Sequence, residues 1–119
     1  MTYLRSSEAQ IARLLAVRHT GPVRMLNLIR YAGEKGPERY ARYVRAAGEI
    51  LDQIGARVLY DGEVLTGIVG PADEQWDRML LVEYPSLKVF LTMSRSKEFV
   101  AISQWRLDAL ADHRLIALS

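Results

Sequence analysis

The sequence predicts one α+β domain in the order strand, helix, strand, strand, helix, strand, with an extra helix in front. The chain has 119 residues, which is the length of a single domain. Half of the residues are hydrophobic and a quarter are charged, as in globular rather than disordered proteins. Apolar residues recur at helical spacing in some segments and form β-rich runs in others. We expect residues 1–119 to form a single domain, in which 1–20 are the extra helix and 22–118 are the rest.

Composition excludes several functional classes. Without cysteine, the chain has no disulfide framework, thiol nucleophile or thiolate metal site. The net charge of +2 is too small to indicate a nucleic-acid partner. No apolar run near the N-terminus reaches the roughly 20 residues of a membrane span. We therefore expect a cytoplasmic protein that binds neither nucleic acid nor a membrane.

The extra N-terminal helix is predicted from an amphipathic pattern. Ile11, Leu14 and Leu15 share one face of a helix, and Ser6 or Ser7 can cap its first turn. A transit peptide is the alternative, but we expect this helix to pack on the domain.

The next two elements are a strand and a long helix. The β-rich run from Val23 to Tyr31 ends at a turn rich in glycine, residues 33–36. From Glu38 to Ile54 the spacings of three and four residues predict a helix, and Gly55 is well placed to end it. The apolar positions are Tyr40, Val44, Ala47, Leu51 and Ile54.

Two further β-rich segments, Arg57 to Tyr60 and Glu63 to Val69, are joined by Asp61-Gly62. This dipeptide favours a tight turn, which would make the pair a small hairpin. One long strand with a bulge at Gly62 fits the same residues, and the sequence leaves both arrangements open.

The C-terminal third predicts a strand, two helical segments and a final strand. Met79 to Tyr84 is almost unbroken apolar sequence. Pro85-Ser86 opens a helix, and Ser96 caps a further one. The last strand is expected over His113 to Leu118.

This order is the ferredoxin-like arrangement, an antiparallel sheet with two helices on one face. If the other face were in water, each strand would alternate between apolar and polar residues. Instead, both parities are apolar in Met79 to Val82 and mostly so in Val23 to Tyr31. Something must therefore cover the second face of the sheet, and in so short a chain the simplest candidate is the same face of a second copy. We expect a homodimer that packs sheet against sheet.

Several short segments of the chain resemble a known family. The segments are Met25-Leu26-Asn27-Leu28, Gly55 with Arg57 to Tyr60, Gly70-Pro71 with Trp76-Asp77, Leu81 to Ser86, Phe90 with Met93, Phe99, and Arg106 with Leu110, Asp112, Arg114, Leu115 and Ile116. Over about residues 22–118 they are similar to the domain-of-unknown-function family 1330, within the dimeric α+β barrel superfamily. The resemblance implies a ferredoxin-like protomer whose sheet packs on that of a partner, forming a barrel. It implies no reaction, since the superfamily includes cofactor-independent monooxygenases, muconolactone-isomerase-like enzymes and haem-binding members.

Asn27 is the least expected residue on its strand. Its parity places it with Met25 and Ile29, so its side chain should point into the protein. A buried amide needs hydrogen-bond partners. It therefore either orients a ligand in a pocket or bonds to a neighbouring side chain or strand.

Glu83 is the corresponding exception on the strand that contains Met79 and Leu81. A carboxylate in an apolar wall has a raised pKa unless a cation is close, and it then serves as a general acid or base. The alternative is an ion pair with an arginine such as Arg57 or Arg106.

Other candidates for ligand binding are an arginine and several tyrosines. Arg106 lies among apolar residues and either holds an acidic substrate or forms a structural salt bridge. Tyrosines at helical or strand positions either rim a cavity or belong to the core. They are Tyr31, Tyr40, Tyr43, Tyr60 and Tyr84. His19 and His113 show no metal-ligand spacing, so no metal and no cofactor are expected.

Two functional hypotheses follow. The first is a metal-free enzyme, isomerase-like or similar to cofactor-independent monooxygenases, with a cavity near Asn27 and Glu83. The second is a non-catalytic dimeric module, either structural or binding a small apolar or acidic ligand.

Overall fold

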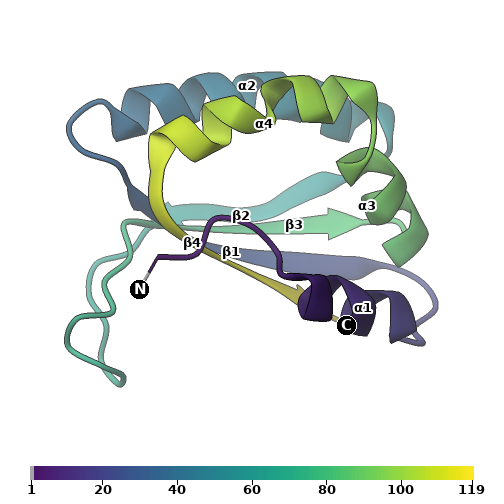
Figure 1. The fold of residues 1–119 in the computed structure, drawn as a ribbon, viewed down its shortest axis with the longest axis horizontal. Coiled ribbons are helices and arrows are strands. Elements are labelled where there is room, and N and C mark those ends of the chain that lie inside the picture. The colour runs from purple at the N-terminus through teal and green to yellow at the C-terminus, as the bar shows by residue number, and fades with distance from the viewer. Residues whose placement is uncertain (1) are drawn as a thin grey trace.

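Two long helices cover one face of a four-stranded antiparallel sheet in the computed structural model, which describes residues 2–119 (Figure 1). The strand order is β2-β3-β1-β4, so the two strands nearest in sequence to the ends of the domain, β1 and β4, lie side by side. This is the ferredoxin-like fold, and the predicted fold class is confirmed. The elements are α1 (Glu8–Ala16), β1 (Val23–Tyr31), α2 (Gly36–Gln53), β2 (Arg57–Glu63), β3 (Arg78–Tyr84), α3 (Leu87–Ser94), α4 (Lys97–Ala109) and β4 (Leu110–Leu118).

The two sides of β1 face different surroundings. Val23, Met25 and Ile29 are buried, and they belong to the two core clusters under the helices. Leu26 and Leu28 alternate with them and point to the opposite side, which α2 and α4 do not cover. We call this second surface the open face. It comprises Arg24, Leu26, Leu28 and Arg30 of β1 and the residues paired with them, which include Met79, Leu81, Glu83, Arg114, Ile116 and Leu118.

Glycines fix both ends of α2. A Cβ atom on Gly36 would lie 2.8 Å from Cβ of Tyr31 and 3.0 Å from the carbonyl oxygen of Ala109, so only glycine lets the helix begin this close to the sheet. Gly55 follows the helix with φ of 77°, the left-handed conformation that glycine adopts without strain. As a result α2 lies across the helix-facing side of β1.

Serine caps begin three helices where the sequence predicts them. The hydroxyl of Ser7 accepts from Gln10 N–H in a capping box, and Ser86 and Ser96 cap α3 and α4. In the single protomer no α1 residue is fully buried and Leu14 is half-buried, so the packing of this helix on the domain stays a prediction. In Figure 1, α1 lies on the side of the sheet away from α2 and α4. Within residues 2–119 no helix combines the length and apolarity needed to cross a bilayer.

The Asp61-Gly62 dipeptide is not a hairpin turn. It continues β2, pairing with Leu80 and Met79, and the irregularity of this strand lies between Val58 and Tyr60 rather than at Gly62. The second β-rich segment is not a strand either. Because Glu63 already pairs with Arg78, the first residue of β3, no strand remains for the residues that follow it. They form a loop over residues 64–77.

Candidate functional site

A polar cluster lies between the sheet and α4. Nε2 of His113 lies 2.9 Å from Oδ1 of Asn27, and Nδ1 of His113 lies 3.0 Å from a guanidinium nitrogen of Arg106. Because arginine only donates, Nδ1 accepts, and the proton on Nε2 is donated to Asn27. The amide nitrogen of Asn27 also donates to the carbonyls of Met25 and Leu80, both at 3.3 Å.

His113 is held in its neutral form. Burial and, next, the charge of Arg106 lower the pKa of His113 from its ordinary value of 6.5 to about 4. Protonation of Nδ1 would also place two donors against each other, because Arg106 already donates to this atom. The imidazole is therefore a neutral group with one donor and one acceptor at pH 7.

Arg106 is the member of this cluster whose hydrogen-bond donors are not all used within the described part of the protein. It reaches inward from α4 towards Tyr40 and Tyr43 of α2 and is partly buried, which lowers its pKa, although the guanidinium stays charged. Within residues 2–119 no carboxylate lies within 4.0 Å of it, and its one hydrogen bond is to neutral His113. A buried cation normally has an anionic partner. This guanidinium therefore has donors available for an anion.

Aromatic rings extend the cluster along α2. The ring centroids of Tyr31 and Tyr40 are 6.0 Å apart, and those of Tyr40 and Tyr43 are 5.7 Å apart. Burial raises the pKa of both Tyr40 and Tyr43, so their hydroxyls stay protonated at any ordinary pH. Of the residues singled out in the sequence, Asn27, Arg106, Tyr31 and Tyr40 are brought to this one region.

His113 is the member of the cluster that sequence reasoning set aside, because it lacks a metal-binding pattern. The available signal was its strand position: register places it opposite Ile29, a fully buried residue on the helix-facing side. A histidine on that parity points into the core and needs partners for both ring nitrogens.

Glu83 and Tyr60 lie elsewhere, on the open face. Glu83 forms ion pairs of 2.8 Å with Arg24 and 3.0 Å with Arg57. The hydrogen bond from Arg57 is the main cause that lowers the pKa of Glu83, so it is not raised as general acid catalysis requires. Asn27 faces the helices and Glu83 faces the opposite side. The expected cavity lined by both residues therefore does not form, because the sheet itself separates them.

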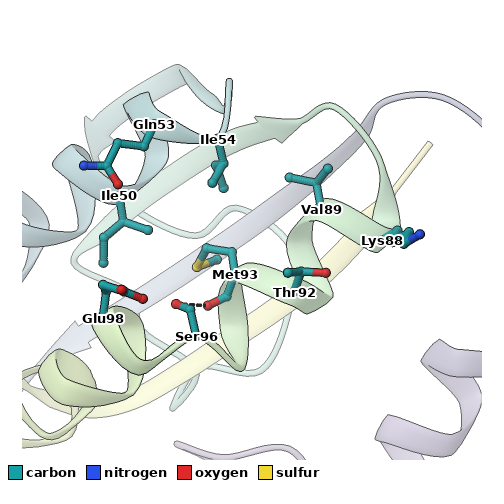
Figure 2. A pocket seen from close by; sticks show the side chains of 9 residues that line it. All are labelled: Ile50, Gln53, Ile54, Lys88, Val89, Thr92, Met93, Ser96 and Glu98. Atoms are coloured by element: carbon teal, nitrogen blue, oxygen red, sulfur yellow. Dashed lines mark hydrogen bonds between the residues drawn. The ribbon is translucent and has the colours of Figure 1, made fainter.

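Two surface hollows lie beyond this cluster. Figure 2 shows the larger one, of about 500 Å³, where Ile50 of α2 and Ile54, which follows that helix, face Val89 and Met93 of α3. The other, of about 370 Å³, is lined by Arg39, Arg42, Trp105 and Asp108. None of these residues belongs to the polar cluster. In the described part of the chain, no three His, Asp or Glu side chains converge in a way that could hold a metal ion.

The chain was compared with known families and solved structures. Residues 29–118 match the family described as domain of unknown function DUF1330. RPA0582, a protein of unknown function from Rhodopseudomonas palustris, is 32% identical, with 99% of this chain and 96% of that chain covered and a TM-score of 0.90. No protein with curated annotation matches significantly.

More distant structures share the fold alone. A dimeric ferredoxin-like protein of unknown function from Bacteroides fragilis is 13% identical, with 86% of this chain and 99% of that chain covered and a TM-score of 0.59. The hydroxynitrile lyase of Passiflora edulis is also 13% identical, with coverages of 81% and 90% and a TM-score of 0.63.

Proposed function

This chain belongs to the DUF1330 family, and we propose that it forms a homodimer that binds a small organic anion between its sheet and helices. The observation that carries the proposal is the guanidinium of Arg106. It is partly buried beside Tyr40 and Tyr43 and has a neutral histidine, but no carboxylate, as its partner among residues 2–119. A carboxylate ligand would supply the missing charge and match the fork of donors.

The surroundings of Arg106 favour a carboxylate attached to an apolar or aromatic body. Tyr40 and Tyr43 are buried in the core beside this arginine, and the half-buried ring of Tyr31 packs against Tyr40, so the surroundings of the guanidinium are aromatic. An anion that took the donors of Arg106 would also leave Nδ1 of His113 free to accept a proton. This fits a metal-free proton-transfer reaction, such as an isomerisation.

The second candidate function is binding without catalysis. It is favoured by a specific observation: both ring nitrogens of His113 and all the amide atoms of Asn27 already have partners in the protein. Glu83 has no catalytic role in either proposal. Its ion pairs with Arg24 and Arg57 place it at one end of the open face.

The homodimer is proposed because the open face is apolar at its centre. Leu26 and Leu28 lie there beside Leu81, Ile116 and the half-exposed ring of Tyr60. Apolar sheet faces of this kind are normally covered. The ferredoxin-like protein from Bacteroides fragilis, which shares the fold, is described as dimeric, which supports the proposal. We also propose a cytoplasmic location, which suits a cysteine-free chain.

Isothermal titration calorimetry with benzoate tests the site. Arg106→Met should weaken benzoate binding by about tenfold to a hundredfold, the usual value of a hydrogen bond to a charged group. Arg45→Met, which removes an exposed arginine of α2, is the matched control and should leave affinity unchanged. Benzyl alcohol, which lacks the charge, should not bind measurably. Equal binding of benzoate by the wild type and Arg106→Met, or no binding at millimolar benzoate, would refute the site.

A further inference from the structure

The loop of residues 64–77 carries the three most exposed large apolar side chains of the described chain. Leu65 is 94% exposed, Ile68 is 89% exposed and Val69 is 97% exposed. Single exposed apolar residues are common, but three within five positions form a patch that a protein in water normally covers.

The loop is held at its base. The N–H of Val64 donates to the carbonyl of Asp77 at 3.0 Å, and the N–H of Asp77 donates to the carbonyl of Ile29 at 2.7 Å. The carboxylate of Asp77 in turn accepts from the N–H of Tyr31 at 2.8 Å. In Figure 1 the loop projects to the side of the sheet away from α2 and α4, which is the side of the open face. The base of the loop is therefore fastened to the sheet, and the loop extends on the side of the open face.

The open face is modest in plan area for a dimer interface. Four strands about 4.8 Å apart, with seven to nine residues of about 3.3 Å each, cover roughly 500 Å². A stable interface buries about 800 Å² per partner. An apolar element beside the sheet face would add to the buried area of such a dimer.

The charges of the loop and of the open face also favour contact between two copies of this chain. The loop contains Asp73, Glu74 and Asp77 and no basic residue. The open face has four arginines, at positions 24, 30, 57 and 114, which share two carboxylates, at 83 and 112, within the protomer, so this face keeps an excess of positive charge. One of these arginines, Arg57, has a side chain that is 71% exposed. An acidic loop with an apolar tip thus complements the rim of the same surface on another copy.

We propose that the loop of residues 64–77 is an arm that docks on the second copy of this chain, beside the sheet-to-sheet contact. The proposal rests on the homodimer proposed above. In the dimer, the apolar tip of each arm is buried against the partner, and the carboxylates of Asp73 and Glu74 face the arginines of the partner's open face.

Analytical ultracentrifugation of the full chain tests the arm. The triple variant Leu65→Ser, Ile68→Ser, Val69→Ser should raise the dimer dissociation constant at least about tenfold. It should keep the wild-type circular dichroism spectrum, because these side chains pack on nothing in the protomer. Val100→Ser, the same kind of change on exposed α4, is the control and should change dissociation less than about twofold.

The two ways of failing are distinguishable. If the wild type and the triple variant form equally tight dimers, the arm is refuted and the homodimer stands. If the wild type remains monomeric at 100 µM, the homodimer is refuted and the arm with it. A triple variant that dissociates while Val100→Ser stays dimeric supports both.

Discussion

Lowering the pH from 8 to 5 should destabilise this protein through His113. The pKa of His113 is about 4 in the folded protein, because of burial and the neighbouring charge of Arg106, against an ordinary value of 6.5. At pH 8 the imidazole is neutral in both states and contributes nothing to the pH dependence. As the pH falls below 6.5, the unfolded chain gains a proton that the native protein does not. Linkage then lowers the free energy of unfolding by about 2 kcal/mol at pH 5 and about 3 kcal/mol at pH 4.

The titration of carboxylates does not mask the effect of His113 on stability between pH 8 and pH 5. The pKa values of Glu83 and Asp112 are lowered in the folded protein, by the hydrogen bond from Arg57 in Glu83 and, against burial, by the hydrogen bonds of Tyr3 N–H and Arg114 in Asp112. Their stabilising effect is present above the unfolded pKa and is lost mainly below pH 5.

The assay is urea denaturation at fixed protein concentration, at pH 8, 6.5 and 5. We expect His113→Gln to remove about 2 kcal/mol of the wild-type difference between pH 8 and 5, whereas His19→Gln, a change at an exposed loop histidine, should keep it. The reasoning is refuted if His113→Gln and the wild type lose stability equally over this range, because the buried imidazole would then not be the titrating group.

Three further predictions concern other parts of the molecule. Gly36→Ala should cost about 1–3 kcal/mol in urea denaturation, because its new methyl group meets Cβ of Tyr31. Asp112→Asn should cost about 1.5–3 kcal/mol at pH 7, since Asp112 is only 1% exposed and accepts from Arg114 at 2.7 Å; an unchanged midpoint would contradict this. Glu83→Gln should change benzoate affinity less than about twofold by calorimetry, because Glu83 lies across the sheet from the anion site. A loss of affinity comparable to that of Arg106→Met would contradict this and show that Glu83 contributes to the binding site.

The expectation that Asn27 and Glu83 line one cavity was wrong for a physical reason, whereas the alternative ion pair of Glu83 with Arg57 is present. Strand parity tells which residues share a face, but it does not tell which face the helices cover. When both parities are apolar, as on β1 and β3, the pattern offers no means to choose. Only strand pairing showed that Glu83 lies opposite Arg24, on the open face, whereas Asn27 lies opposite Leu80 under the helices.

The loop of residues 64–77 illustrates the same limit. The β-rich composition of residues 63–69 predicted a strand, but a strand needs a partner with free N–H and carbonyl groups. Because β3 begins at Arg78, directly opposite Glu63, the sheet has no such partner. The strand propensity of these residues is therefore not realised, because no neighbouring strand is available to pair with them.

Sequence patterns alone predicted the order of elements, the helix caps, the absence of thiol chemistry and the surplus of apolar strand positions. These features depend on residues close together along the chain, where spacing and capping are visible. Tertiary structure alone decided that His113 bridges Asn27 and Arg106, that Arg106 lacks a carboxylate partner in the described chain, and that Glu83 is neutralised by two arginines. Those contacts join residues of different elements, and their energies depend on register and on which face is buried. Neither quantity is encoded within any one segment.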